Sequence, residues 1–264
     1  MIKVGVVGAL GKMGREVVKA VSESKDMELV LAVDIMQEGF DVGKLVLGQE
    51  NGVKISSDIL EGIKSIKPDV VVDFTQPNSI FEHVCLYLSN STRCVIGTTG
   101  LSDEQLSKIN QLSVENKTSC FIAPNFTTGA VLMMMFAKQA AKYFDNAEII
   151  ELHHNQKKDA PSGTAIKTAQ LMAEVNDNFS VGNCPETELI EGSRGGNADA
   201  NIRIHSVRMP GYIASQEVIF GASGQILKIR HDSMDRTCYM AGVLMAIRYA
   251  MDTQEFVYGL DNVM

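Results

Sequence analysis

The sequence predicts an α/β protein with two domains, a parallel sheet covered by helices and a smaller α+β domain. Three observations predict this fold. Short apolar runs alternate with helical segments through the first half, a glycine-rich turn follows the first run, and the alternation stops after Pro124. A chain of 264 residues is long enough for two ordinary domains.

The first domain is predicted from the short continuous apolar runs, which are typical of strands buried on both faces of a parallel sheet. Helical segments between the runs supply the crossovers, and Ser102 with Gln105 forms a capping-box pattern at the start of one of them. The predicted strands are residues 2–7, 27–34, 69–75, 93–98 and 119–123, and the predicted helices are residues 13–22, 78–89 and 102–116.

The second domain is predicted from a different pattern after Pro124. A tight turn at Ala222-Ser223-Gly224 joins the last two of its strands, so its sheet is antiparallel or mixed. The predicted elements are a helix at 128–144, strands at 147–154, 202–208, 216–221 and 225–231, a polar stretch at 176–200, and a final helix at 235–251.

The composition indicates a cytoplasmic protein. The formal net charge is −8, and no dense run of Lys or Arg predicts a nucleic-acid-binding face. No stretch is long and apolar enough for a membrane span or a signal peptide. The five cysteines are scattered and odd in number, which favours reduced thiols over a disulfide framework.

A glycine turn after the first strand predicts dinucleotide binding. Gly8-Ala9-Leu10-Gly11-Lys12-Met13-Gly14 follows a strand and opens a helix, whose free N–H groups favour a pyrophosphate. Asp34 ends the second strand, where a carboxylate accepts hydrogen bonds from ribose hydroxyls. The alternative is a turn and a strand-end aspartate without a ligand. Residues 97–100 and 123–126 follow two more strands, at the edge where such sheets bind ligands.

The stretch from Glu151 to Ala165 predicts a catalytic site for a small anionic substrate. His153 can exchange a proton near neutral pH, and Lys157 can stabilise developing negative charge or donate a proton. Ser162-Gly163-Thr164 begins a helix whose N–H groups and hydroxyl suit a carboxylate. Two alternatives stay open: a histidine pair without catalytic function, and a metal site at His153 and His154. Adjacent residues on a strand point to opposite faces, which disfavours the metal.

These motifs resemble those of the dihydrodipicolinate reductase family. The pattern E-x-H-H-x-x-K-x-D-A-P-S-G-T-A at residues 151–165 is highly specific, and the similarity extends in the same order over essentially the whole chain. Further matching segments are residues 8–14, 73–75, 97–100, 123–126, 204–208, 210–211 and 229–233.

The resemblance implies an NADH- or NADPH-dependent reduction of 4-hydroxy-tetrahydrodipicolinate to tetrahydrodipicolinate in lysine and diaminopimelate biosynthesis. It also implies a Rossmann-like cofactor domain at 1–126 and 234–264, and a substrate-binding and tetramerisation domain at 127–233 of a homotetramer. His153 resembles the catalytic acid/base and Lys157 a second proton donor. The implied substrate contacts are His154, Ser162, Gly163 and Thr164. The implied cofactor contacts are Gly8, Ala9, Leu10, Gly11, Lys12, Met13, Asp34, Gly97, Thr98, Thr99, Ala123, Pro124, Asn125 and Phe126; no metal is implied.

Two departures from the family pattern bear on specificity. Ser215 stands where family members usually have histidine, and Ile35 and Met36 follow Asp34 where some relatives have an arginine suited to a 2′-phosphate. We therefore expect NADH to be used at least as well as NADPH. Two other functions remain on the same scaffold: a different Rossmann-type amino-acid dehydrogenase, which has no need of the motif at 151–165, and a non-catalytic dinucleotide sensor, which would lose His153 and Lys157.

Overall fold

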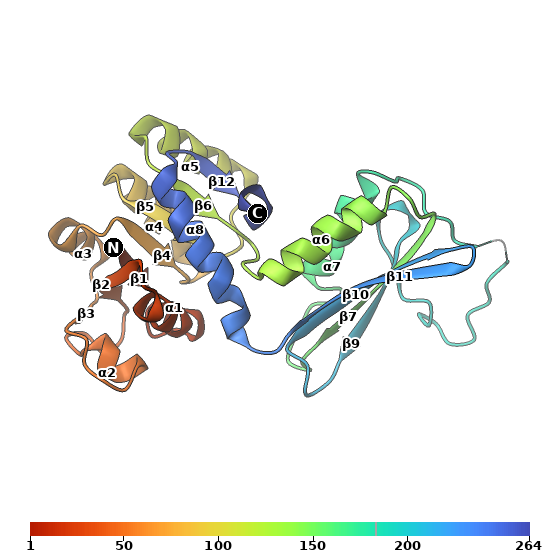
Figure 1. Ribbon diagram of the computed structural model, residues 1–264, viewed down its shortest axis with the longest axis horizontal. Helices are drawn as coiled ribbons and strands as arrows, with labels where there is room; N and C mark the ends of the chain where they lie inside the picture. Colours follow the sequence, from red (N-terminus) through yellow and green to blue (C-terminus); the bar gives the residue numbers. More distant parts are fainter. Residues whose placement is uncertain (183) are drawn as a thin grey trace. The chain divides into compact units, whose positions relative to one another are not determined.

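The computed structural model describes residues 1–182 and 184–264 and divides into two compact units (Figure 1). Unit 1 comprises Met1–Thr128 and Arg236–Met264, and unit 2 comprises Gly129–Asp235. The C-terminal segment therefore belongs to the same unit as the glycine turn. No helix among the described residues is long and apolar enough to cross a membrane.

Unit 1 is built on a seven-stranded sheet in which every neighbouring pair is parallel. The order β12-β6-β5-β4-β1-β2-β3 reverses between β1 and β4, the position at which such sheets bind ligands. The strands are β1 (Ile2–Val7), β2 (Met27–Val33), β3 (Ile55–Ser56), β4 (Val70–Asp73), β5 (Arg93–Ile96), β6 (Cys120–Ile122) and β12 (Phe256–Tyr258).

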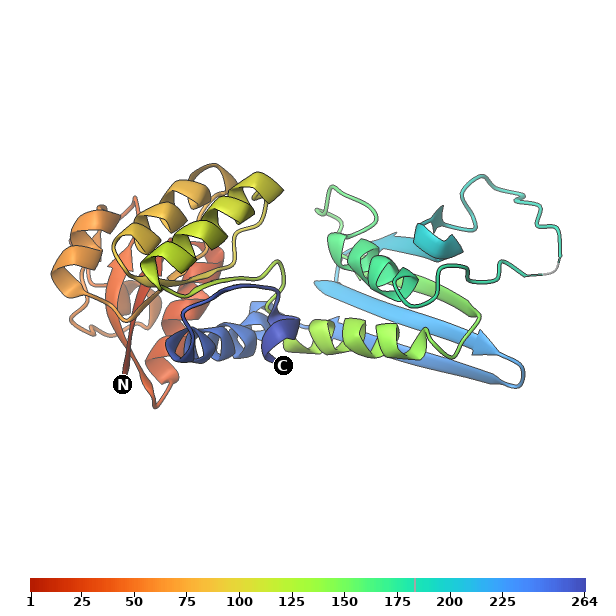
Figure 2. The same cartoon turned by 90° about the horizontal axis from the view of Figure 1, so that it is seen from above.

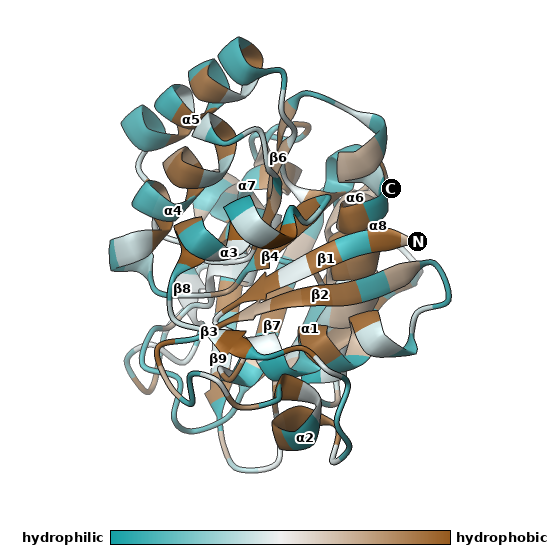
Figure 3. Cartoon of the chain, turned by 90° about the vertical axis from the view of Figure 1, so that its left-hand side faces the viewer, coloured by the Kyte–Doolittle hydropathy of each residue, from teal (hydrophilic) through white to brown (hydrophobic). Residues whose placement is uncertain are grey.

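Helices cover both faces of this sheet, which is why its strands are mostly apolar (Figures 2 and 3). Figure 2 shows α3, α4 and α5 on one side of the sheet and α1 and α8 on the other. Val4, Val6 and Val72 in the central strands are fully buried. The helices are α1 (Lys12–Glu23), α2 (Val42–Val46), α3 (Ile59–Ile66), α4 (Pro77–Ser89), α5 (Asp103–Asn116) and α8 (Met240–Asp252), with short 3-10 helices η2 (Arg236–Tyr239) and η3 (Leu260–Val263).

Unit 2 is built on a five-stranded mixed sheet in the order β11-β10-β7-β9-β8. β7 pairs antiparallel with β10 and parallel with β9, so of the two predicted kinds of sheet, antiparallel or mixed, the structure has the mixed one. The elements are α6 (Thr128–Ala140), β7 (Asn146–His153), α7 (Gly163–Ala173), β8 (Gly196–Asn197), the 3-10 helix η1 (Asp199–Asn201), β9 (Arg203–Arg208), β10 (Ala214–Ala222) and β11 (Gln225–Ser233).

The two faces of the unit 2 sheet differ in burial. Ile149 and Val218 project from one face into a core that α6 and α7 complete with small side chains. Alternate residues point the other way, and Ile150, Val207 and Ile219 on that second face remain partly exposed. One face of the sheet thus forms the core of the unit, and the other presents apolar side chains that the unit leaves partly open.

The structure corrects several element boundaries. The helix predicted at 128–144 ends at Ala140, and the one predicted at 235–251 becomes regular only at Met240, after η2. The sequence prediction also omitted five short helices and strands, namely α2, β3, α3, β8 and β12. Periodicity is too weak to define segments of two to eight residues. The capping box of α5 is confirmed, because Ser102 and Gln105 bond each other's backbone N–H groups.

Candidate active site

The glycine turn between β1 and α1 is formed by close backbone contacts. Gly8 has a φ of +76°, and its carbonyl oxygen accepts a hydrogen bond from the Gly11 N–H (3.0 Å). A Cβ at Gly14 would lie 1.9 Å from the same oxygen, so only glycine fits there. Gly11 caps α1 without a side-chain hydrogen bond. The first N–H groups of α1, at Lys12 and Met13, therefore remain available to an anion.

The Asp34 carboxylate lies against this turn. Its Oδ2 accepts a hydrogen bond from the Leu10 N–H (2.8 Å), and its Oδ1 accepts one from the Met36 N–H (3.1 Å). Each carboxylate oxygen can accept a second bond, so Asp34 orders the turn and keeps capacity for ribose hydroxyls. Lys12 is exposed and makes no ion pair within residues 1–182 and 184–264.

The loops after β5 and β6 meet at the same edge of the sheet. Gly97 donates its N–H to the Asp73 carbonyl oxygen (3.0 Å), and Ala123 donates to that of Ile96 (3.1 Å). A Cβ on Gly97 would fall 1.9 Å from the ring of Phe74, so this loop also needs glycine. The two loops share a pocket lined by Thr98, Thr99, Gly100, Leu101, Ile122, Pro124 and Tyr258.

The two remaining predicted cofactor residues, Asn125 and Phe126, shape the end of the second loop. The Asn125 Oδ1 accepts a hydrogen bond from the Thr127 N–H (2.9 Å), and Phe126 is buried. All the predicted cofactor contacts therefore lie in unit 1, at or near the carboxyl ends of its strands. The backbone cradle at Gly8–Gly14 fits a pyrophosphate because a side chain at Gly14 would close it.

In unit 2, His153 stands at the end of β7 with its ring held by a buried carboxylate. Glu151 is 0% exposed, and its Oε2 lies 2.5 Å from His153 Nδ1. The two residues are two positions apart on one strand, so they share a face of the sheet. The side chain of His153 is 14% exposed, and because Nδ1 is bonded to Glu151, Nε2 is the ring nitrogen left to meet a ligand.

The electrostatics around His153 favour its neutral form in the absence of a ligand. Burial is the largest influence and lowers the pKa of His153, and the charges of Lys157 and Arg208 act in the same direction. The Glu151 carboxylate opposes them by stabilising the imidazolium. The pKa of His153 therefore lies below its ordinary value, and an anionic ligand beside the ring would raise it again.

Lys157 lies four residues beyond His153 in the loop that leads to α7. Its Nζ donates to both oxygens of Asp159, at 2.8 and 2.7 Å. The hydrogen bond from Lys157 is the largest influence on the Asp159 carboxyl and lowers its pKa. Asp159 is largely exposed, so a ligand carboxylate can compete with it for the ammonium group.

The start of α7 presents a second candidate anion site. Ser162 is buried, and its hydroxyl oxygen accepts a hydrogen bond from the Ala165 N–H (3.2 Å) as the helix cap. The N–H groups of Gly163 and Thr164 have no partner within the helix. Apart from its chain neighbours and the backbone of its own helix, no atom of the described residues lies within 4 Å of a Cβ built on Gly163, so this helix end is open. Gly163 and Thr164 are therefore better placed than the buried Ser162 side chain to meet a carboxylate.

His154, the other predicted substrate contact, lies beyond the end of β7 and is exposed. Its Nδ1 accepts a hydrogen bond from the Gln156 N–H (3.2 Å), which orders the turn between the strand and Lys157. The structure thus brings His153, Lys157 and the first turn of α7 into one region. The two adjacent histidines have different partners, since His153 is bonded to Glu151 and His154 to the Gln156 N–H.

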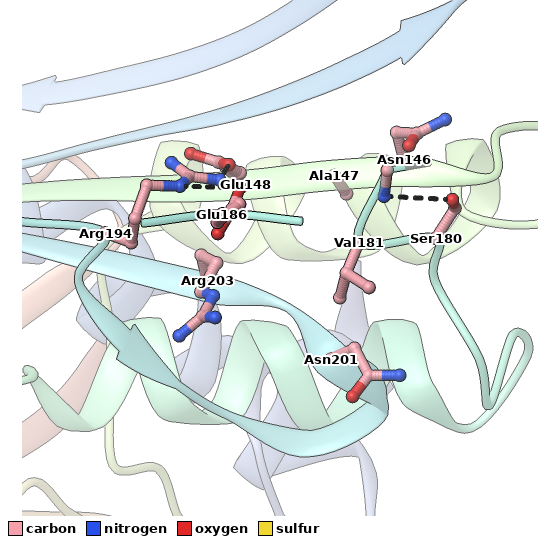
Figure 4. A pocket seen from close by; sticks show the side chains of 10 residues that line it. Asn146, Ala147, Glu148, Ser180, Val181, Glu186, Arg194, Asn201 and Arg203 are labelled. Atoms are coloured by element: carbon pink, nitrogen blue, oxygen red, sulfur yellow. Dashed lines mark hydrogen bonds and ion pairs between the residues drawn. The ribbon is translucent and has the colours of Figure 1, made fainter. Parts of the chain in front are cut away.

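A separate pocket lies at the opposite end of β7 (Figure 4). It includes Asn146, Ala147 and Glu148 at the start of the strand, roughly 17–23 Å from His153 at about 3.3 Å per residue. Arg194 bonds Glu148 and Glu186 there, at 2.7 and 3.0 Å. This pocket contains none of the residues that the sequence predicts for catalysis.

Two residues in the site had no assigned role in the sequence prediction. Glu151 binds His153, and Arg208 bonds both oxygens of Glu151, at 2.8 and 2.6 Å. The spacing of Glu151 and His153 on one strand was a usable signal. Arg208 could not be placed, since it reaches the site through the pairing of β9 with β7.

Two family models match the chain, "Dihydrodipicolinate reductase, N-terminus" over residues 2–126 and "Dihydrodipicolinate reductase, C-terminus" over residues 129–264. The 4-hydroxy-tetrahydrodipicolinate reductase of Listeria innocua is 48% identical over 263 residues, covering 100% of both chains. The solved structure of a dipicolinate-bound dihydrodipicolinate reductase from Paenisporosarcina sp. TG-14 is 47% identical, with a TM-score of 0.89 and 100% coverage of both chains. An amine dehydrogenase from Mycobacterium smegmatis has a TM-score of 0.72 at 14% identity, covering 100% and 96% of the two chains; that likeness concerns the fold alone.

Proposed function

The chain belongs to the dihydrodipicolinate reductase family, and we propose that His153 and Lys157 handle the protons of its reaction. The reaction is the reduction of 4-hydroxy-tetrahydrodipicolinate in lysine and diaminopimelate biosynthesis, and the enzyme is an oxidoreductase. The observation that carries the assignment of residues is the single carboxylate of Glu151, which binds both His153 and the backbone at the start of α7.

The site in unit 2 suits a small ring with two carboxylates. The open N–H groups of Gly163 and Thr164 would receive one carboxylate, with the Thr164 hydroxyl as a further donor. Lys157 would leave Asp159 and approach the substrate, because a dianion offers a stronger partner than one exposed aspartate. Dipicolinate, the compound bound to the relative from Paenisporosarcina, has this arrangement of charge.

The chemistry divides between a cofactor and the side chains of unit 2. A reduced nicotinamide cofactor, held at Gly8–Met13, Asp34 and the loops after β5 and β6, supplies a hydride when bound. His153 carries a proton on Nε2 and delivers it to the substrate, whose negative charge raises the pKa of the imidazole. The Lys157 ammonium stabilises the electron density that builds up on the conjugated ring and is a second proton source.

We further propose that NADH is used at least as well as NADPH. Asp34 suits the hydroxyl groups of an unmodified ribose and would repel a 2′-phosphate. Ile35 and Met36 follow it, both strongly exposed, and neither offers a positive charge. Lys12 is the nearest cation in sequence on the turn, and as a flexible point charge it gives partial compensation only.

The assembly and location are also proposals. We propose a cytoplasmic homotetramer that uses the partly exposed apolar face of the unit 2 sheet, at Ile150, Val207 and Ile219. Light scattering on the purified protein should give four times the chain mass, and Ile219→Glu should reduce it. A monomeric wild-type protein would contradict the assembly.

The function is tested by a coupled assay. Pyruvate, aspartate semialdehyde and the synthase that precedes this step generate the substrate in the cuvette, and loss of NADH absorbance reports turnover. We expect oxidation that depends on both this protein and the synthase, and inhibition by pyridine-2,6-dicarboxylate. The proposal would be contradicted if NADH were oxidised equally well without the synthase. It would also be contradicted if NADH were oxidised only with a different amino-acid substrate.

A further inference from the structure

Glu151 is a buried carboxylate that binds groups from three different segments of unit 2. It is 0% exposed, and its two oxygens receive His153 Nδ1 (2.5 Å), both terminal nitrogens of Arg208 (2.8 and 2.6 Å) and the Ser162 N–H (3.2 Å). Burying an isolated carboxylate would be costly, and these donors offset that cost.

The parallel pairing of β7 with β9 creates this cluster. In the register of the two strands, His153 lies opposite Arg208 and Glu151 lies opposite Ser206. All four side chains therefore share one face of the sheet. Arg208 reaches across and forms a two-pronged bond with Glu151, the arrangement for which a guanidinium is suited.

The charge state of Glu151 determines what His153 can do. Burial acts to raise the pKa of Glu151, but the hydrogen bonds from Arg208, Ser206 and His153 outweigh it, and the pKa lies below its ordinary value. An ionised carboxylate can only accept hydrogen bonds. The proton of neutral His153 must therefore sit on Nδ1, which leaves Nε2 as the nitrogen that faces the open side.

We propose that Glu151 and Arg208 are positioning residues that fix the tautomer and orientation of His153 and join it to the substrate-binding turn. This inference rests on the proposed role of His153. Glu151 directs Nε2 toward the substrate and stabilises the imidazolium, while Arg208 keeps Glu151 from taking the proton itself.

The same pair connects the other two parts of the site. Ser162, whose N–H bonds Glu151, is the cap of α7, so Glu151 fixes the helix end at Gly163 and Thr164. Arg208 also donates to the Asp159 carbonyl oxygen (2.8 Å), in the loop that carries Lys157. The Glu151–Arg208 ion pair thus contacts His153, the start of α7 and the loop that carries Lys157, and so fixes their relative positions.

The chain offers a matched control on the same strand. Glu148 also binds a histidine, with His205 Nε2 at 2.8 Å. It binds an arginine as well, with Arg194 at 2.7 Å (Figure 4). Glu148 points to the opposite face from Glu151, the face proposed for assembly, and its side chain is 35% exposed. Light scattering on Glu148→Gln should therefore give the wild-type mass before its activity serves as the control. Substitution of Glu148 removes a Glu–His–Arg cluster of the same composition from outside the site.

The test compares Glu151→Gln with Glu148→Gln in the full-length protein, with and without substrate. The charged groups that act on His153 are Glu151 beside it on β7, Lys157 from the loop and Arg208 from β9. Asp159 is the ion-pair partner of Lys157. Removing the negative charge of Glu151 lowers the pKa of His153. Because His153 acts as an acid, activity falls as the pH rises through its pKa, and Glu151→Gln should move that fall to lower pH.

We expect Glu151→Gln to lower kcat about tenfold to a hundredfold with a smaller change in KM, and Glu148→Gln to leave both kcat and the pH profile unchanged. Arg208→Lys should recover part of the kcat lost in Arg208→Met. An unshifted pH profile in a folded Glu151→Gln protein would overturn the proposal.

A spectroscopic measurement keeps the proposal testable if Glu151→Gln does not fold. Nitrogen-15 spectra of wild-type protein labelled at histidine, with His153 assigned by its absence in His153→Gln, should give the tautomer protonated on Nδ1. The other tautomer would overturn the proposal. Near-normal turnover in His153→Gln would instead refute the proposed function, so the two failures are distinguishable.

Discussion

Two helix ends, one in each unit, present free N–H groups to an anion, and they are built in opposite ways. The α1 end relies on the backbone, with no side-chain cap and with Gly14 against the carbonyl oxygen of Gly8. The α7 end relies on side chains, with the Ser162 cap and with Glu151 bonded to the Ser162 N–H. A Cβ added at Gly163 would meet no described atom within 4 Å outside its chain neighbours and its own helix backbone.

The difference shows which changes each site should tolerate. A site made by close backbone approach depends on the absence of side chains, so added atoms damage it and altered surface charge does not. A site held by a buried ion pair depends on charge and hydrogen bonds, so isosteric neutral substitutions damage it. This contrast suits a pyrophosphate held by many N–H groups in unit 1 and a proton transfer that needs one defined histidine in unit 2.

The largest effect is expected at Lys157. Lys157→Ala should lower kcat by a factor on the order of 10² or more, because it removes a positioned charge and proton donor. The Kd of NADH should barely change, since the predicted cofactor contacts lie in unit 1. Lys158→Ala, at an exposed neighbour without an ion pair in the described chain, is the control and should keep normal turnover. Equal losses of kcat in both variants would contradict the proposed role of Lys157.

The next prediction compares the two helix ends by adding one methyl group to a glycine in each. Gly14→Ala forces a Cβ onto the Gly8 oxygen and should lower the free energy of unfolding by about 1–3 kcal/mol and weaken NADH binding. Gly163→Ala meets open space and should leave the unfolding midpoint unchanged. Denaturant unfolding of both variants checks this, and similar midpoints would show that the α1 end is not built by close approach.

A smaller effect is expected at Thr164. Thr164→Val should cost about 1–3 kcal/mol in binding of pyridine-2,6-dicarboxylate, measured by calorimetry, because it removes a hydrogen bond to a charged group. Thr164→Ser keeps the hydroxyl and should recover most of the affinity. If Val and wild type bind equally, the start of α7 is only a helix end.

The smallest effect concerns cofactor choice. We expect kcat/KM with NADH to equal or exceed that with NADPH at fixed ionic strength, because Asp34 repels the 2′-phosphate and Lys12 compensates only in part. Lys12→Ala should widen the difference. A wild-type preference of about tenfold or more for NADPH would refute the argument from Asp34.

The sequence predicted the parts of the fold that local patterns define. The apolar runs located five parallel strands, and the tight turn at Ser223-Gly224 between β10 and β11 is confirmed by their register. β12 was missed because its three residues join the sheet only through pairing with β6, more than 130 residues earlier in the chain. Such pairing leaves no periodic signal.

The residues of the candidate site also fall into two groups, those that local sequence predicted and those that it did not. His153, Lys157 and the start of α7 were predicted because they lie within one short stretch of sequence. The function of Arg208 was not, since Glu151 and Arg208 are 57 residues apart and only the β7–β9 register brings them together. Local motifs predicted the groups that we propose to contact the substrate, and the residues that hold these groups were found only in the tertiary structure.

The central claim is that His153 transfers the proton of this reduction. The direct measurement is the rate of NADH oxidation in a single turnover, with enzyme in excess of the enzymatically generated substrate, for wild type and His153→Gln. We expect a rate lower by a factor on the order of 10² or more in the variant, with an unchanged Kd for NADH. A variant that oxidises NADH at nearly the wild-type rate would contradict the account.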